Sequence, residues 1–86
     1  MIAPSIHING TSGELLLEQQ TSAISAIYKA LGAMDSASPN GRDYYVQGTD
    51  AFRRAQNEHQ SRVDSLRKVL MEMNEIAEKI ADLIDS

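Results

Sequence analysis

The residues best suited to binding chemistry lie together in the middle of the chain, in the stretch Gly41–Gly48, GRDYYVQG. Tyr44 and Tyr45, two of the chain's four aromatic residues, stand side by side there, with Arg42 before them and Gln47 after them. Tyrosine faces stack on nucleobases, and arginine guanidinium groups form forked hydrogen bonds to phosphate. The stretch is therefore a candidate site for a planar, anionic ligand.

Arg53 adds a second cation to this candidate site, at the start of the helix that we expect to follow. The first N–H groups of a helix also favour an anion at that end. A purely structural reading explains the same residues: Tyr44 and Tyr45 would cover the open end of a helical core while Arg42 pairs with Asp43. The sequence leaves the ligand site and the structural cap both open.

A second polar group lies near the N-terminus, where Asn9, Thr11 and Ser12 alternate with glycines. Such a turn can form an anion-binding nest, although a plain turn followed by a helix cap explains it without a ligand. It lacks the lysine and the spacing of a phosphate-binding P-loop. We include these three residues in the candidate site as a contribution from a neighbouring chain.

Metal binding and catalysis are not expected. The chain has no cysteine, His7 has no partner at ligand spacing, and His59 lies on an apolar seam. No nucleophile, base and orienting group come together in the pattern, so we expect neither an enzyme nor a cofactor.

The elements that must position these residues are two helices. Leu16, Ala23, Ile27, Ala30 and Met34 line one face with Gln20 among them, beside a stripe of Leu17, Ile24 and Leu31. Residues 49–85 carry a seven-residue repeat of apolar positions with His59 among them: Phe52, His59, Leu66, Met73 and Ile80, beside Val63, Leu70, Ala77 and Ile84.

Capping and helix-breaking residues between these patterns predict where each helix begins and ends. Thr11 and Glu14 have the spacing of a capping box, and Thr49 is a candidate cap for the second helix. We expect one domain over residues 1–86, with helices over about 12–36 and 49–85 and a loop over 37–48 that contains Pro39. The short segment Pro4–Asn9 should be extended.

The expected fold is all-α, an antiparallel two-helix hairpin assembled into a homo-oligomeric helical bundle, because two helices cannot enclose both apolar faces. If Met34 lies near Phe52, Tyr28 reaches the loop end and all four aromatic residues gather there. The last turns of the second helix, around Ile80, would then project past the start of the first, partly covered by Ile6 and Ile8.

Charge and hydropathy argue against several classes of protein. The net charge is −4, and residues 63–86 hold six anions against three cations, which argues against a duplex nucleic-acid binder. The longest apolar run is Leu15–Leu17, too short for a membrane span, and the N-terminus lacks a signal-peptide pattern.

Two short motifs carry a resemblance to a known group. His7–Ser12 (HINGTS), followed by Asn40–Gly48 (NGRDYYVQG) before a long helix, resembles small uncharacterised proteins of tailed bacteriophages. The similarity covers nearly the whole chain, with Val46 where the group's proline is expected. It implies a phage product in the cytoplasm of a bacterial host.

We therefore expect a phage-encoded, non-enzymatic binding protein that sequesters a small nucleotide-type signal molecule of host antiviral defence, such as a cyclic nucleotide or an ADP-ribose derivative. The argument is an analogy with compact helical oligomers that act as sponges. The alternative is a coiled-coil interaction or assembly protein that binds a host or phage protein through Met71, Met73 and the acidic C-terminal rows. A third, weaker reading is an inhibitor that masks a host enzyme's nucleic-acid site.

Overall fold

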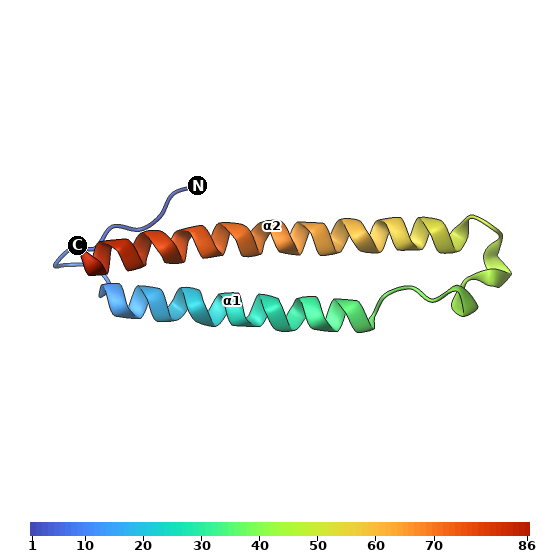
Figure 1. Ribbon diagram of the computed structural model, residues 1–86, viewed down its shortest axis with the longest axis horizontal. Helices are drawn as coiled ribbons and strands as arrows, with labels where there is room; N and C mark the ends of the chain where they lie inside the picture. Colours follow the sequence, from blue (N-terminus) through green and yellow to red (C-terminus); the bar gives the residue numbers. More distant parts are fainter.

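The computed structural model describes all 86 residues as two long antiparallel helices joined by a loop (Figure 1). Helix α1 spans Gly13–Ser36 and helix α2 spans Ala51–Asp85. The loop contains two short 3-10 turns, η1 at Gly41–Asp43 and η2 at Tyr45–Gln47, and the chain has no strand. The predicted all-α hairpin is confirmed, with helix bounds within two residues of those expected.

The helix starts differ from the predicted caps. Ser12 caps α1, because its hydroxyl oxygen accepts a hydrogen bond from the Leu15 amide at 3.2 Å. With Ser12 as the cap, Glu14 stands one position too early for a capping box, although its charge still favours the first turn of the helix. Asp50, rather than Thr49, precedes α2.

The predicted apolar faces are the faces that pack between the helices. In α1 every predicted position, including Gln20, is half-buried, and in α2 every predicted position is half-buried or buried. Because the spacing of these residues alone defines one side of each helix, the sequence was sufficient to identify the contact faces.

The register between the helices differs from the expected one. A side chain added at Gly13 would lie 2.9 Å from Ile84, and at the other end Ser38 lies 3.4 Å from His59. Each step forward along α1 therefore matches one step back along α2, which places Met34 at the level of Val63 rather than Phe52. The difference of 11 residues (63 minus 52) corresponds to about 16 Å along the helix.

The surplus length of α2 consequently lies at the loop end. Figure 1 shows the start of α1 beside the end of α2, whereas α1 stops well short of the start of α2. The prediction that the last turns of α2 project past α1 is wrong, because Gly13 has no side chain and lets Ile84 pack closely there. Ile80, one turn away, has no exposed surface.

The N-terminal segment folds over this end of the hairpin. The Ile6 side chain approaches Gly13, at 2.7 Å from the position a side chain would take, as predicted for covering this surface. Ile8 does not contribute, since it is 98% exposed in a turn closed by a 3.0 Å hydrogen bond from the Gly10 amide to the His7 carbonyl.

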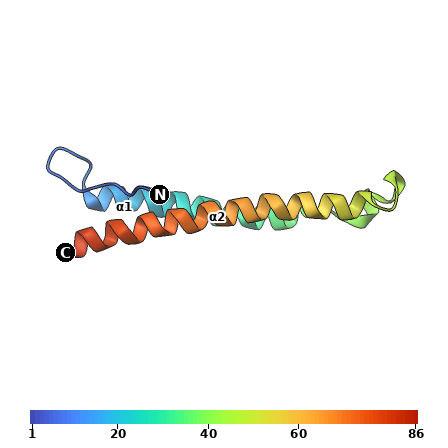
Figure 2. The same cartoon turned by 90° about the horizontal axis from the view of Figure 1, so that it is seen from above.

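The hairpin is long and thin, with extents of 61 × 20 × 19 Å (Figure 2). Its accessible surface is 6398 Å², whereas a compact monomer of this mass exposes about 5,000 Å². Only Gly13, Leu70 and Ile80 are buried. Neither helix combines the length and hydropathy needed to cross a membrane.

Two glycines in α1 provide a matched test of the packing at Gly13. We expect Gly13→Ala to lower the free energy of unfolding by about 1 kcal/mol, because the new methyl group must displace Ile6 and Ile84. Gly32→Ala should raise it by about 0.5–1 kcal/mol, since Gly32 is helical and has open space around it. Chemical denaturation measures both. A Gly13→Ala protein as stable as wild type would contradict the close contact.

Candidate functional site

The loop divides the roles of its two tyrosines. Tyr44 is half-buried and its ring lies 6.2 Å from the ring of Phe52, centroid to centroid, in a tilted arrangement. Tyr45 is 77% exposed. The structural cap that was expected of both tyrosines therefore fits Tyr44 only, and Tyr45 is left exposed.

Short-range hydrogen bonds give the loop a defined backbone. The Asn40 side-chain oxygen accepts from the Arg42 amide at 3.1 Å, and the Asn40 carbonyl accepts from the Asp43 amide at 3.0 Å. The Tyr44 carbonyl accepts from the Gln47 amide at 2.9 Å, which closes the second 3-10 turn. Because of these bonds, Arg42 and Tyr45 lie on a loop segment with a defined backbone conformation.

Gly48 ends this segment in a conformation that side chains rarely adopt. Its φ is +108°, the only positive φ in the chain. A glycine is required there because a Cβ atom would clash with the backbone.

An open pocket of 330 Å³ lies beside the exposed tyrosine. Its lining residues are Gly41, Tyr45, Gly48, Thr49 and Phe52. None of them is charged, so a charged part of a ligand would have to be held from outside the pocket. Two of them are glycines, which add no side chain to the pocket.

The arginines near this pocket differ in availability. Arg53 forms the structure's one ion pair, with Asp50 at 3.1 Å, and both side chains are mostly exposed. Arg42 is exposed and forms no ion pair, so the expected pairing of Arg42 with Asp43 is absent. Of the two predicted site arginines, only Arg42 therefore has no carboxylate bound to it.

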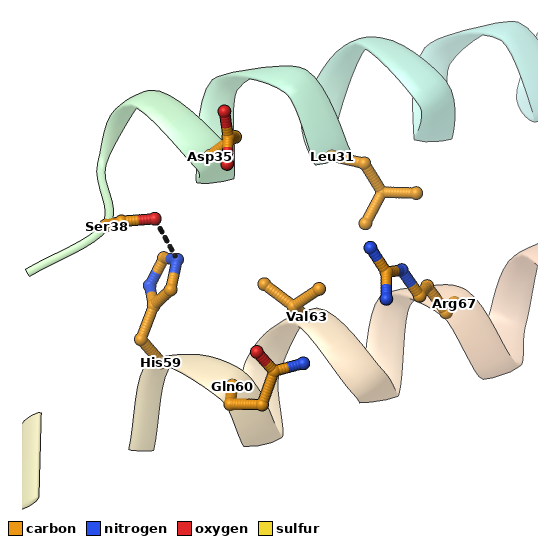
Figure 3. A pocket seen from close by; sticks show the side chains of 7 residues that line it. All are labelled: Leu31, Asp35, Ser38, His59, Gln60, Val63 and Arg67. Atoms are coloured by element: carbon orange, nitrogen blue, oxygen red, sulfur yellow. Dashed lines mark hydrogen bonds between the residues drawn. The ribbon is translucent and has the colours of Figure 1, made fainter. Parts of the chain in front are cut away.

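A second pocket, of 130 Å³, lies where α1 ends (Figure 3). Leu31 and Val63 contribute its apolar wall, and His59 reaches across to Ser38. His59 is half-buried and hydrogen-bonded, as expected for a polar residue in the seam. No hydrogen bond joins His59 to a carboxylate, so the Ser38–His59 pair lacks the orienting group of a catalytic triad.

This pocket also contains Asp35, Gln60 and Arg67, with the Arg67 guanidinium directed into it (Figure 3). The expected register, with Met34 near Phe52, places Ile27 rather than Ser38 opposite His59, so the sequence pattern did not bring this group together. Only the observed register does so.

The predicted site residues fall into two groups at opposite ends of the hairpin. Arg42, Tyr44, Tyr45, Gln47 and Arg53 share the loop end, and the turn with Asn9, Thr11 and Ser12 lies at the other end (Figure 1). One chain therefore does not bring the two groups together.

The N-terminal turn and Tyr28 differ from what was predicted for them. The Ser12 hydroxyl is occupied by the helix cap, whereas the side chains of Asn9 and Thr11 form no hydrogen bond within the chain. The prediction that all four aromatics gather at the loop end is wrong for Tyr28, because the observed register places it at the level of Val69. No group of three metal-ligating side chains lies close together.

The division of the tyrosines predicts different effects on stability. Tyr44→Ala should lower the free energy of unfolding by about 1–3 kcal/mol, because it removes the ring that packs on Phe52. Tyr45→Ala should change it by less than about 0.5 kcal/mol, since that side chain is exposed. Thermal unfolding followed by circular dichroism compares them. Equal losses for the two variants would contradict the division.

Comparisons with known proteins give no match at the level of protein families, of curated proteins or of solved structures. The site is therefore interpreted from its own geometry.

Proposed function

We propose that the chain is a non-enzymatic binding protein whose loop holds a small, phosphate-bearing ligand of the nucleotide type. The observation that carries this proposal is the exposure of Tyr45 on an ordered loop. A structural cap accounts for Tyr44, which packs on Phe52, but it gives no reason for a second, exposed ring beside it. Exposed aromatic rings on defined backbone are what base stacking requires.

The surroundings of Tyr45 support this ligand class. The neighbouring pocket of 330 Å³ lies at the lower limit of the roughly 300–1,000 Å³ range of ligand pockets. Its uncharged lining suits a base or a ribose, and the unpaired Arg42 guanidinium suits a phosphate. Arg53 has a smaller role in this proposal than in the sequence analysis, because a phosphate there would compete with Asp50.

The resemblance to small phage proteins supports a biological role for such binding. The protein would sequester a signal molecule of host antiviral defence, a cyclic nucleotide or an ADP-ribose derivative, and lower its free concentration without converting it. This mode of action requires no catalytic group, and it requires the protein to be at least as abundant as the signal.

Single substitutions in the loop test the proposal. Wild type is titrated calorimetrically with cyclic dinucleotides and ADP-ribose derivatives, and Arg42→Ala should weaken binding of the ligand found by about tenfold or more, because a charge-assisted hydrogen bond contributes about 1.5–3 kcal/mol. Tyr45→Ala should weaken it similarly through lost stacking. Arg62→Ala is the control, since Arg62 is an exposed cation of α2 away from the loop. No binding by wild type at millimolar concentrations would refute the proposal.

A second candidate function is that of a helical interaction or assembly protein. The observation that favours it is the exposure of three large apolar side chains on the C-terminal half of α2, Val69, Met71 and Leu83. Met71 is 64% exposed, whereas Met73, which was expected to share the partner face, is half-buried. Methionine adapts to irregular partner surfaces.

For this second candidate function, substitutions in α2 rather than in the loop should matter. Met71→Glu should abolish co-purification of a protein partner from the host, because a charge would be buried at the contact. Tyr45→Ala should leave co-purification unchanged, since Tyr45 belongs to the loop. Quantitative affinity purification measures both variants against wild type. Loss of the partner with Tyr45→Ala but not with Met71→Glu would contradict this candidate.

A further inference from the structure

We infer that the hairpin pairs with a second copy of itself in antiparallel orientation, so that the N-terminal turn of each copy lies beside the loop of the other. The inference deepens the proposed function and rests on it in one respect: the turn would supply Asn9 and Thr11 to the ligand site at the partner's loop. The pairing itself is carried by three independent properties of the surface.

The first property is the amount of exposed surface. The chain exposes 6398 Å², about 1,400 Å² more than a compact monomer of its mass. A standard protein–protein interface removes about 800 Å² from each partner. The surface that a second copy would bury on each chain is therefore smaller than the extra surface that the hairpin exposes.

The second property is the charge difference between the two ends. With the observed register, residues 29–68 form the loop half of the molecule, with seven cations and five anions, or +2. Residues 1–28 and 69–86 form the other half, with one cation and seven anions, or −6, and the two values sum to the net −4. Apart from Arg53, no cation of the loop half has an ion-pair partner within the chain.

This charge difference selects the orientation. A parallel pair would place the two −6 halves side by side, where like charges repel. An antiparallel pair places each −6 half beside a +2 half, so that an unpaired arginine such as Arg54 faces a surface rich in glutamate and aspartate.

The third property is the location of the most exposed apolar side chains. Ile8 is 98% exposed in the N-terminal turn at one end of the hairpin, and Tyr45 and Val46 are 77% and 75% exposed at the other. Figure 2 shows the N-terminal turn standing out from the helices at the end opposite the loop. Antiparallel pairing brings these two apolar ends together, and parallel pairing does not.

The absence of cysteine makes the orientation directly measurable, because each introduced cysteine carries a single spin label. Gln19→Cys and Asn57→Cys are both at exposed helical positions. In the observed register Gln19 lies at the level of Glu78. Along α2, the levels of the two labels are therefore separated by 21 residues (78 minus 57), or about 30 Å. The two levels lie at about equal distances from the middle of α2, on opposite sides of it.

Electron–electron double resonance distinguishes the antiparallel pair from the parallel pair. It is measured on Asn57→Cys alone and on an equimolar mixture of the two singly labelled chains. Antiparallel pairing predicts that the distance from Gln19 to Asn57 of the partner is shorter than the distance between the two Asn57 labels. Parallel pairing predicts the reverse order and would overturn the inference, as would a monomer by sedimentation equilibrium at the labelling concentration. Circular dichroism checks that both labelled chains keep the helical content of wild type.

Ile8→Glu provides a second test that does not depend on labels. The side chain is 98% exposed in the single chain, so the variant should keep the wild-type helical content. If Ile8 is buried against the partner's loop, the dimer dissociation constant should rise by about tenfold or more. An unchanged dissociation constant would show that the turn does not contact the partner.

The pairing and the ligand site can fail separately. Antiparallel label distances without nucleotide binding would refute the proposed function and leave the pairing intact. Nucleotide binding by a protein that sediments as a monomer would refute the pairing and leave the loop site intact. Where both hold, Thr11→Ala should weaken binding of the same nucleotide without changing the label distances, and unchanged binding would remove the turn from the site.

Discussion

The close approach at Gly13 is the contact on which the rest of the arrangement depends. Ile84 and Ile6 occupy the space where a side chain would otherwise stand, which brings the start of α1 against the last turn of α2. Because the two helices are antiparallel and regular, one such contact sets the pairing of every other residue along them. Ser38 opposite His59 follows from it at the far end.

This register also determines the form of the loop. Since α2 is longer than α1 and their other ends coincide, the first turns of α2 have no α1 residues beside them. The loop runs along those turns, with Gly41 against Phe52 and the tilted Tyr44 ring packed near the same ring. Packing in this way places Tyr44 against Phe52 and leaves Tyr45 exposed, so the different environments of the two tyrosines are a consequence of helix register at the opposite end of the molecule.

A two-helix protein must also place its function on its surface. Almost no side chain is fully buried, and the largest open pockets lie at the two ends of the hairpin rather than between the helices. The unequal charge of the two halves and the apolar side chains at both ends then decide which surfaces can meet. The proposed ligand binding at the loop and the proposed association along the hairpin both depend on this incomplete burial of side chains.

The amino-acid sequence alone was enough to define the helices, their bounds to within two residues, and the side of each helix that packs, because the spacing of apolar residues is a local property of a helix. It also identified the loop as the place where Arg42, Tyr44 and Tyr45 gather. It could not determine the register, since a regular seven-residue repeat in α2 fits α1 in several shifted positions. Only the tertiary structure resolved this choice, through the fit of Ile84 and Ile6 at Gly13, and with it the separation of Tyr28 from the loop, the Ser38–His59 contact and the different environments of the two neighbouring tyrosines.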